Sequence, residues 1–396
     1  MERFFYTSLI GCFFFLSPLS TKQPLQVEVK ASSAVVMNAD TGRVLYERRP
    51  HDTAYPASTT KIATALFILT EKQTPFNQML TVSKESLKMR PTPTPGNFHP
   101  YWWDKEGTRI WLKEGERLSV EALLHGLMMV SGDDAANVLA EGSSGSIPLF
   151  VEEMNQYLKK LGCSHTHFLN PHGCHHPEHV TTAYDLCLMT KEALKWPQFR
   201  EIVSTISYKK AKTNKQGVVE WKQSNPLLDP TKPHYYPKAI GIKTGFHSAA
   251  KNCLVAAAVH EGRTLIAAVL GAPQRKDRYK DAIRLFEAAF AEKKETRRFF
   301  KQGSFFRKQI VGAKTELIAV LKEDLTLSFF PSEEPQMRAF VNWEIQGMPI
   351  QKGAKVGEVR LIDETGALLV KGDLFAQEAV KGKFFFLIKE WFRQFF

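Results

Sequence analysis

The spacing of hydrophobic residues changes along this 396-residue chain, and this change restricts the fold more than any other feature. Up to about residue 195, apolar residues recur at helical intervals, in the stretches 58–71, 120–130, 147–161 and 181–195. Further along they form short continuous runs, which predict strands at 239–243, 253–259 and 265–270. A hairpin at 32–48 and a helix at 277–292 are expected at the two ends of this region. The pattern therefore predicts a mixed α/β domain.

A highly charged segment at residues 292–298 divides the chain into two parts. Beyond it, residues 305–380 contain short β-type runs, such as 325–329, separated by turn residues. We therefore expect a mixed α/β domain at 30–294, followed by a small all-β domain at 299–380. No interior stretch approaches the roughly 20 uncharged apolar residues that a membrane span needs, which excludes a polytopic membrane protein.

The charge balance of the chain is basic. Lysine and arginine outnumber aspartate and glutamate by 53 to 41, which gives a net charge of +12. Such a surface suits phosphate-rich or acidic polymers. The surplus is spread along the chain, however, and no helix-turn-helix, ribonucleoprotein or zinc-finger motif accompanies it. We therefore expect no nucleic-acid partner.

The N-terminus, residues 1–20, has the pattern of an export signal. Arg3 supplies the positive flank, residues 4–16 an apolar core, and residues 17–20 small side chains for cleavage. Residues 9–12 (LIGC) also resemble a lipoprotein cleavage box, which remains an alternative. We expect an exported protein of the periplasm or the extracytoplasmic face of the cytoplasmic membrane. Three disulfide pairings are then open to the four remaining cysteines, Cys163, Cys174, Cys187 and Cys253.

The C-terminus, residues 382–396, predicts an amphipathic helix. Its apolar arc consists of Phe384, Phe385, Leu387, Ile388, Trp391, Phe392, Phe395 and Phe396. Its polar arc consists of Lys383, Lys389, Glu390, Arg393 and Gln394. A helix of about 20 Å is too short to cross a bilayer, but it fits the membrane interface. We expect peripheral association with the membrane surface; packing of the helix on its own domain is the alternative.

The first predicted helix begins at the motif Pro56-Ala57-Ser58-Thr59-Thr60-Lys61. Ser58 and Lys61, three residues apart, lie on one helix face, one turn apart. A serine hydroxyl becomes an effective nucleophile when a neighbouring base takes its proton, and a lysine amine with a lowered pKa can be that base. Backbone N–H groups at a helix N-terminus help to stabilise an oxyanion. Alone the pair is weak support, because such spacings also arise by chance on surface helices.

Two further motifs strengthen this interpretation. Ser131-Gly132-Asp133 follows the apolar helix at 120–130, where a hydroxyl and a short polar side chain can enter a cleft. Lys243-Thr244-Gly245 is expected at the end of an apolar strand, where a cation and a hydroxyl can hold a carboxylate. Gly245 leaves room for the backbone to approach a ligand.

Ser-x-x-Lys, Ser-Asp-Asn and Lys-Thr-Gly are the motifs of class A β-lactamases and penicillin-binding proteins. The chain resembles the low-molecular-mass penicillin-binding proteins that act as D-alanyl-D-alanine carboxypeptidases. The similarity extends from about residue 31 to the C-terminus, and it includes the blocks 38–42, 55–61, 134–136, 170–173 and 241–245. It implies an α/β (α+β) catalytic domain like that of serine β-lactamases and penicillin-binding transpeptidases, a small C-terminal all-β domain and an amphipathic C-terminal helix.

The resemblance also implies catalytic roles. Ser58 is the nucleophile that attacks the carbonyl of the penultimate D-Ala of a peptidoglycan stem peptide, forming an acyl-enzyme and expelling the terminal D-Ala. Lys61 is the general base, and Ser131 relays protons to the leaving amine. Water then releases the shortened peptide, and β-lactam antibiotics acylate the same Ser58. No cofactor and no metal are implied.

Substrate contacts follow from the same resemblance. Lys243 and Thr244 bind the terminal carboxylate of the peptide, with Gly245 beside them. The backbone N–H groups of Ser58 and Phe246 form the oxyanion hole.

Asp133 departs from the family pattern, which usually has asparagine there to donate an N–H to the substrate amide. An ionised aspartate cannot donate a hydrogen bond. It also raises the pKa of an adjacent lysine, which works against Lys61 as a neutral base. We expect Asp133 in the substrate-binding site of an active enzyme with altered kinetics, where it either pairs with Lys243 or slows turnover.

Two clusters have competing interpretations. Six of the twelve histidines lie between His165 and His179, with Cys163 and Cys174 among them, a density that suggests zinc. No standard ligand spacing is present, so we expect a histidine-rich surface loop, with a Cys163–Cys174 disulfide as an alternative.

The aromatic residues at 101–103 are expected to pack against their own domain; a partner or glycan surface is the alternative.

Two other functions compete with the carboxypeptidase. A serine β-lactamase deacylates rapidly through the Glu of a Glu-x-x-Leu-Asn motif, but here Thr166 takes the place of that Glu before Leu169-Asn170. A poorly catalytic penicillin-binding or peptidoglycan-binding protein is the other candidate, because of Asp133.

Overall fold

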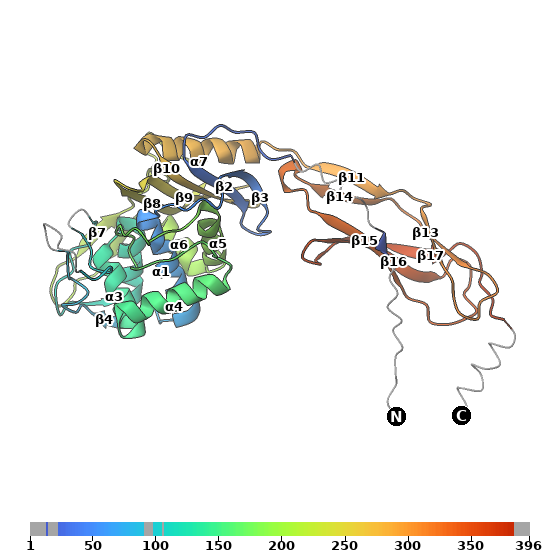
Figure 1. Cartoon of the computed structure of the whole chain (residues 1–396), viewed down its shortest axis with the longest axis horizontal. Helices are drawn as coiled ribbons and strands as arrows, with labels where there is room; N and C mark the ends of the chain where they lie inside the picture. Colours follow the sequence, from blue (N-terminus) through green and yellow to red (C-terminus); the bar gives the residue numbers. More distant parts are fainter. Residues whose placement is uncertain (1–12, 15–22, 91–97, 105–106, 384–396) are drawn as a thin grey trace, which may run out of the picture. The chain divides into compact units, whose positions relative to one another are not determined.

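The computed structural model describes residues 13–14, 23–90, 98–104 and 107–383 (Figure 1). It divides into two compact units, which we call the larger unit and the β-rich unit. The larger unit is Pro24–Ala291; the β-rich unit comprises Met1–Gln23 and Glu292–Phe396. The motifs that begin at Ser58, Ser131 and Lys243 all lie in the larger unit.

An antiparallel five-stranded sheet forms the centre of the larger unit, in the order β3-β2-β10-β9-β8. Its strands are β2 (Ser33–Asn38), β3 (Val44–Arg48), β8 (Ala239–His247), β9 (Lys251–His260) and β10 (Arg263–Ala272). The predicted hairpin and strands are therefore confirmed, and β8 to β10 are longer than predicted. The hairpin turn closes because the Asn38 side chain accepts hydrogen bonds from the backbone N–H groups of Asp40 and Thr41.

Helices cover both faces of this sheet (Figure 1). They are α1 (Lys61–Phe67), α2 (Val120–His125), α3 (Asp133–Ser144), α4 (Ile147–Lys160), α5 (Ala183–Ala193), α6 (Pro197–Ser204) and α7 (Arg275–Phe290). Side chains alternate along the strands. Val36 and Leu254 therefore share one core with α7, whereas Val35 and Val255 share the other core with α1, α3, α4 and α5.

Short polar residues start several of these helices. Ser119, Ser146 and Thr182 accept hydrogen bonds from backbone N–H groups in the first turns of α2, α4 and α5, respectively. Two small antiparallel two-stranded sheets complete the larger unit: β4 (Met79–Thr81) with β5 (Arg117–Ser119), and β6 (Ser207–Lys210) with β7 (Val219–Lys222).

The two predicted helices next to the Ser58 and Ser131 motifs depart from regular α geometry at their ends. The first starts with a 3-10 turn, Ala57–Thr60, and ends in a π turn, Ile68–Lys72. The second ends in a π turn, Gly126–Val130, just before Ser131. π turns inside α-helices are frequent at functional sites.

The β-rich unit contains a six-stranded sheet in the order β1-β15-β16-β17-β13-β12. Its strands are β1 (Phe13–Phe14), β12 (Phe305–Lys308), β13 (Leu317–Leu321), β15 (Met337–Trp343), β16 (Lys355–Asp363) and β17 (Leu368–Ala376). A smaller sheet pairs β11 (Glu295–Phe300) with β14 (Leu325–Phe329). The predicted small β domain is thus present. The rest of the expected export signal, and residues 384–396 of the predicted terminal helix, lie outside the described residues.

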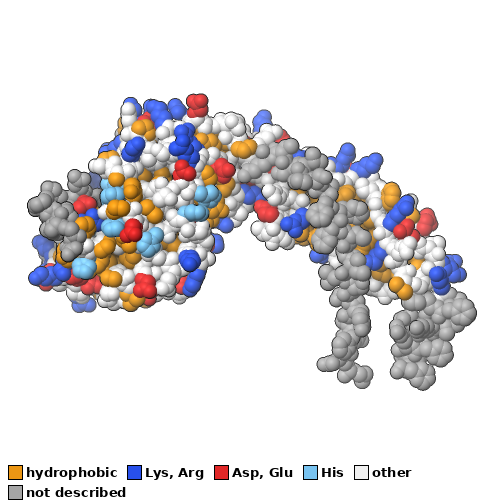
Figure 2. Space-filling model, in the orientation of Figure 1, with side chains coloured by type: hydrophobic (Ala, Val, Ile, Leu, Met, Phe, Trp, Pro, Cys, Tyr) orange, Lys and Arg blue, Asp and Glu red, His pale blue; other side chains and the backbone are white. Residues whose placement is uncertain are grey.

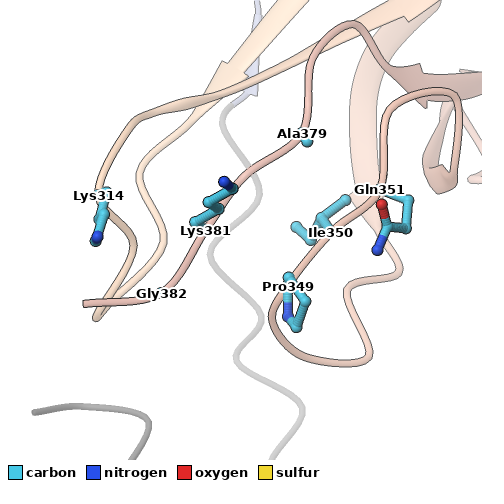
Figure 3. Close-up of a pocket in the computed structure, with 7 residues that line it drawn as sticks. All are labelled: Lys314, Pro349, Ile350, Gln351, Ala379, Lys381 and Gly382. Atoms are coloured by element: carbon cyan, nitrogen blue, oxygen red, sulfur yellow. The ribbon is translucent and has the colours of Figure 1, made fainter. Parts of the chain in front are cut away.

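A pocket of about 390 Å³ lies in the β-rich unit (Figure 3). Its lining residues are Lys314, Pro349, Ile350, Gln351, Ala379, Lys381 and Gly382. None of them belongs to the candidate catalytic motifs considered above. Across the part of the chain that the structure describes, no helix combines the length and apolar character needed to span a membrane.

Candidate active site

Ser58 lies in the 3-10 turn that directly precedes α1. The Thr59 and Thr60 hydroxyls donate hydrogen bonds to the carbonyls of Pro56 and Ala57, at 2.7 and 2.9 Å. Ala57 has a φ of +48°, a conformation that side-chain-bearing residues rarely adopt and that concentrates at functional sites. The turn is therefore fixed by its own threonines, and it leaves Ser58 half-buried at the start of the helix.

Lys61 is fully buried at the first position of α1. Its Nζ donates to Ser58 Oγ at 3.1 Å, to Asp133 Oδ1 at 2.6 Å and to the carbonyl of His172 at 2.7 Å. These three acceptors match the three N–H donors of a lysine ammonium. The structure thus places Ser58 and Lys61 within hydrogen-bonding distance, and it adds two acceptors from distant parts of the chain.

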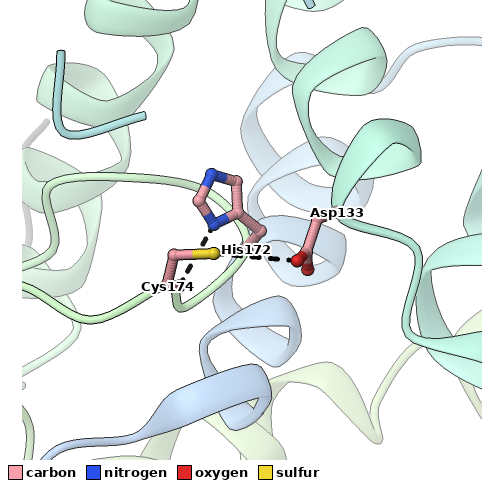
Figure 4. A group of neighbouring side chains, drawn as sticks. All are labelled: Asp133, His172 and Cys174. Atoms are coloured by element: carbon pink, nitrogen blue, oxygen red, sulfur yellow. Dashed lines mark hydrogen bonds between the residues drawn. The ribbon is translucent and has the colours of Figure 1, made fainter. Parts of the chain in front are cut away.

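Asp133 is the first residue of α3 and is only 3% exposed. Its pairing corrects one alternative from the sequence, because the carboxylate forms its ion pair with Lys61 and not with Lys243. The other oxygen, Oδ2, faces the Cys174 Sγ at 3.7 Å (Figure 4). Burial raises the pKa of Asp133, and the Lys61 charge opposes this rise. A glycine is needed beside it, since a Cβ on Gly107 would lie 2.2 Å from Oδ2.

Lys243 projects from β8 and is 1% exposed. Its Nζ donates to the Thr244 carbonyl at 3.2 Å. Burial, followed by the positive charges of Lys61 and Arg278, holds the pKa of Lys243 well below its ordinary value, and Asp133 opposes the shift. The motif 243–245 lies inside β8, which continues to His247, so the expectation that it ends the strand is wrong.

β8 passes close to the Ser58 turn at Gly245. A Cβ on this glycine would lie 2.8 Å from the Pro56 carbonyl oxygen and 3.2 Å from the Ser58 backbone nitrogen. Only glycine allows this approach. Phe246, the next residue along β8, is 64% exposed. The segment proposed to bind the substrate carboxylate is therefore in contact with the turn that carries the proposed nucleophile.

Arg278 on α7 is a site residue that the sequence analysis missed. Its buried guanidinium donates to the Gly245 carbonyl at 2.7 Å and to the Cys253 carbonyl at 3.1 Å, which ties α7 to β8 and β9. The helical pattern at 277–292 predicted the element but could not indicate that a basic residue faces the sheet.

Ser131 is 8% exposed and has a φ of +71°. The Gly132 N–H donates to the Gly126 carbonyl at 3.0 Å, so the π turn at 126–130 closes on itself before α3 begins. This left-handed residue at the junction of two helices is the second non-glycine residue of the site with a positive φ, after Ala57.

The segment 170–173 is buried and holds Lys61 from the other side. Asn170 Oδ1 accepts hydrogen bonds from the backbone N–H groups of His172 and Gly173, at 3.3 and 2.6 Å. Its Nδ2 donates to the Cys174 carbonyl at 2.9 Å. The loop is therefore folded around the asparagine side chain, and this presents the His172 carbonyl to Lys61.

The expected histidine-rich surface loop is thus wrong for two of its members. His172 and His179 are 1% and 2% exposed. Burial, with the Lys61 charge second, lowers the pKa of His172 to about 3. Burial likewise holds the pKa of His179 well below its ordinary value. His179 contacts Thr60 Oγ1 at 2.9 Å through Nε2, so it supports the turn that carries Ser58 as a neutral ring.

Gly173 cannot be replaced without moving this turn. Its φ is +98°, and an added Cβ would lie 1.9 Å from the Ala57 carbonyl oxygen and 3.0 Å from the Ser58 nitrogen. We expect Gly173→Ala to cost more than about 2 kcal/mol of unfolding free energy. It should also lower the acylation rate. Denaturant unfolding and penicillin labelling measure the two effects. Gly145→Ala is the matched control, because Gly145 also has a positive φ but nothing within 4 Å of an added Cβ. Equal losses in both variants would contradict the steric argument.

All four described cysteines are free and buried, so the Cys163–Cys174 disulfide is not formed. Asp133, His172 and Cys174 place one donor atom each within 4.8 Å of one another (Figure 4). These atoms already have partners. His172 Nδ1 accepts the Cys174 N–H and Nε2 contacts the Tyr101 carbonyl, Asp133 Oδ1 binds the Lys61 ammonium, and the Cys174 thiol donates to Asp133 Oδ2. We therefore assign no metal to this group.

The aromatic residues at 101–103 pack within the larger unit, as expected. Tyr101 and Trp103 are buried, and the Tyr101 hydroxyl donates to Glu85 at 3.1 Å. Lysine and arginine side chains are scattered over the face shown in Figure 2, where they do not form one continuous patch. This agrees with the even spread of basic residues along the sequence.

Comparisons with known proteins agree with this geometry. The family described as D-alanyl-D-alanine carboxypeptidase matches residues 19–274. The D-alanyl-D-alanine carboxypeptidase DacF of Bacillus subtilis is 30% identical, over 96% of this chain and 95% of that protein. The D-alanyl-D-alanine carboxypeptidase DacD of Escherichia coli is 29% identical over 87% and 85% of the two chains.

Solved structures give the same result for the fold. The Streptomyces K15 DD-transpeptidase has a TM-score of 0.59 at 30% identity, and the match covers 67% of this chain and 99% of that one. The carboxypeptidase DacD of Francisella tularensis shares the fold over 91% of this chain, with a TM-score of 0.62 at 22% identity. With the predicted fold class present, and with the serine, lysine and Lys-Thr-Gly segments brought together in it, the chain belongs to the serine-type D-alanyl-D-alanine carboxypeptidase family.

Proposed function

We propose that this protein removes the terminal D-Ala from peptidoglycan stem peptides through an acyl-enzyme on Ser58, and that β-lactams acylate the same hydroxyl. The observation that carries the proposal is the 3.1 Å contact between Ser58 Oγ and Lys61 Nζ, at a helix start that belongs to the family's own motif. Nucleophile and base within hydrogen-bonding reach are the structural requirement for such a step.

Acylation starts when a neutral Lys61 amine accepts the Ser58 proton while Oγ attacks the carbonyl carbon of the penultimate D-Ala. The backbone N–H groups of Ser58 and Phe246 stabilise the oxyanion. As the intermediate collapses, the peptide C–N bond breaks, and Ser131 passes the proton from Lys61 to the leaving amine of D-Ala. Deacylation repeats these steps with water as the nucleophile, and the proton returns to Ser58.

Lys243 and Thr244 are proposed to bind the terminal carboxylate of the peptide. Because Lys243 is buried beside other positive groups, its charged form is disfavoured before substrate arrives. A carboxylate brought within hydrogen-bonding distance favours the ammonium form. Substrate binding therefore completes the charge of this subsite, which favours ligands that carry a carboxylate.

Location and domain roles belong to the same proposal. An export signal at 1–20 and an amphipathic helix at 382–396 would place the enzyme at the extracytoplasmic face of the membrane as a peripheral protein. Residues 30–294 would carry the activity, and the domain at 299–380 would link it to the membrane-associating helix.

A β-lactamase function has less support. At the position where the β-lactamase motif has glutamate, Thr166 donates its hydroxyl hydrogen bond to Asp185 Oδ2 at 2.8 Å. Neighbouring Asn170 is used by the 170–173 loop. The glutamate that activates the deacylating water in β-lactamases is thus replaced by a threonine whose hydroxyl is already hydrogen-bonded.

The deciding experiment measures D-Ala release from diacyl-L-Lys-D-Ala-D-Ala and the lifetime of the penicilloyl-enzyme. We expect D-Ala release that is blocked by prior penicillin treatment, and a long-lived adduct that peptide mass mapping assigns to Ser58. Rapid release of the penicilloyl group would indicate a β-lactamase. A stable adduct without any D-Ala release would indicate a penicillin-binding protein without carboxypeptidase activity.

A further inference from the structure

The Asp133–Lys61 ion pair creates a difficulty for the mechanism just proposed. A lysine ammonium that donates to Ser58 Oγ, Asp133 Oδ1 and the His172 carbonyl has no lone pair with which to accept a proton. The uncharged asparagine usual at position 133 would form no such ion pair. The difficulty is therefore specific to a chain with aspartate at this position.

The contact between Lys61 and Asp133 also offers a way to form the neutral amine. The Nζ–Oδ1 distance of 2.6 Å is that of a strong, charge-assisted hydrogen bond, along which a proton can move between two heavy atoms. Both side chains are almost fully buried, with side-chain exposures of 0% and 4%. Burial disfavours two separated charges relative to a neutral amine beside a neutral carboxylic acid.

We propose that Asp133 is a proton-storing partner of Lys61: it takes one proton from the Lys61 ammonium across this hydrogen bond, which leaves the neutral amine that deprotonates Ser58. This proposal rests on the function proposed above. Asp133 acts through Lys61 and not on the substrate itself, and it is therefore a positioning residue.

The steps balance without any further reactant. One N–H bond of Lys61 breaks and one O–H bond of Asp133 forms, so the pair changes from ammonium and carboxylate to amine and carboxylic acid. Lys61 then takes the Ser58 proton as Oγ bonds to the substrate carbonyl carbon. The leaving amine receives a proton from Lys61 through Ser131, as in the scheme above. After deacylation the stored proton returns from Asp133 to Lys61, and the ion pair is restored.

Other charged and titratable groups face Asp133 from each element packed around it. They are Lys61 on α1, His172 and Cys174 on the 170–174 segment, Asp104 before the 107–112 segment, Lys243 on β8, and Asp134 on α3 itself. His172 has a pKa of about 3, and burial raises the pKa of the Cys174 thiol well above its ordinary value. Both therefore remain uncharged near neutral pH.

Burial raises the pKa of Asp133, which favours the carboxylic acid that the proposal requires. The pair as a whole keeps one proton near neutral pH, whichever atom holds it, so its working form does not change with pH there. Only uptake of a second proton, which gives an ammonium beside a carboxylic acid, removes the base. In the wild type, the activity lost at low pH is therefore lost because a carboxyl group takes up a proton.

Asp133→Asn tests this assignment because the variant has nowhere to store the proton. Lys61 must then lose its proton to solvent, and the acidic loss of activity becomes the titration of an amine. We expect the wild-type acylation rate constant with a fluorescent penicillin to be level between pH 8 and 6. For the variant it should fall as the pH decreases through this range, with a limiting slope of about tenfold for each pH unit.

The direction in which the pH profile shifts distinguishes proton storage on Asp133 from a titration of Lys243. Asp133 raises the pKa of Lys243, so its removal lowers that pKa further and would move a Lys243-controlled loss of activity to lower pH. Our proposal requires a shift to higher pH. Cys174→Ala is the matched control, since it removes the thiol that faces Oδ2 but keeps the carboxylate. Because the thiol hydrogen bond is a minor cause that lowers the pKa of Asp133, we expect only a small shift of the loss of activity to higher pH, well short of that in Asp133→Asn.

Several results would overturn the proposal. The acylation rate of the wild type and of Asp133→Asn could fall over the same pH range, or the fall in Asp133→Asn could move to lower pH. The fall in Cys174→Ala could also shift as far as that in Asp133→Asn. A wild-type profile that already falls tenfold per unit from pH 8 would also contradict it, and this measurement needs no variant. The failure of the proposed function is distinguishable, because the wild type would then release no D-Ala, or would release the penicilloyl group rapidly, or would not be labelled at Ser58 at any pH.

Discussion

Ser58→Ala is expected to abolish D-Ala release and covalent labelling by penicillin while the protein remains folded. The alanine variant lacks the hydroxyl proposed to form the acyl bond, and the two other hydroxyls of the turn, those of Thr59 and Thr60, are buried and donate to backbone carbonyls. Where a nucleophile and its base work as a unit, loss of the nucleophile lowers kcat by roughly 10⁴-fold or more. We therefore expect D-Ala release at the background level and no adduct by intact mass spectrometry.

The fold should tolerate this change because the turn does not depend on the Ser58 hydroxyl. The Thr59 and Thr60 hydroxyls and the Thr59 N–H make the hydrogen bonds that close the turn. Lys61 loses one of its three acceptors but keeps Asp133 and His172. The variant's unfolding free energy should be within about 1 kcal/mol of the wild type.

The control is Ser204→Ala, which removes a hydroxyl that donates to the Glu201 carbonyl at the surface of α6. It should keep the wild-type labelling and D-Ala release. A Ser58→Ala protein that still forms a stoichiometric penicilloyl adduct would place the nucleophile elsewhere, and the mechanism proposed for Ser58 would have to be abandoned.

The sequence predicted those parts of the fold that depend on regular periodicity. The strands of the central sheet and the helices at 147–161 and 181–195 follow from short-range hydrophobic spacing, which each segment carries within itself. α3 was missed, although apolar Ala135, Ala136, Val138 and Leu139 have helical spacing and two acids occupy its first turn. Acidic residues there are favourable, so this signal was present in the sequence.

The details of the site depend on contacts between segments far apart in the chain, and periodicity contains no information about them. Ser58 and Lys61 are neighbours in sequence, so their proximity could be predicted. The choice of Lys61 over Lys243 as the partner of Asp133 is set by where α3 meets α1 and β8. The same applies to the His172 carbonyl, which contacts Lys61 across 111 positions of sequence, and to Arg278 under β8.

Lys61→Met is expected to have the second large effect, and it acts on stability as well as activity. The substitution removes the proposed base, so acylation should fall by roughly as much as in Ser58→Ala. It also leaves the buried Asp133 carboxylate without its cation. Breaking a buried ion pair on one side costs about 3–5 kcal/mol of unfolding free energy, because one charge is left uncompensated. Denaturant unfolding at pH 7 and penicillin labelling measure the two losses.

The double variant Lys61→Met/Asp133→Asn separates the structural role of Lys61 from its catalytic role. Neutralising Asp133 removes the uncompensated charge, so most of the lost unfolding free energy should return, and the two substitutions should be strongly non-additive. Acylation should remain abolished, since neither substitution provides a base for Ser58. Recovery of acylation in the double variant would show that Lys61 serves only to neutralise Asp133, and that another group, such as the buried amine of Lys243, takes the Ser58 proton.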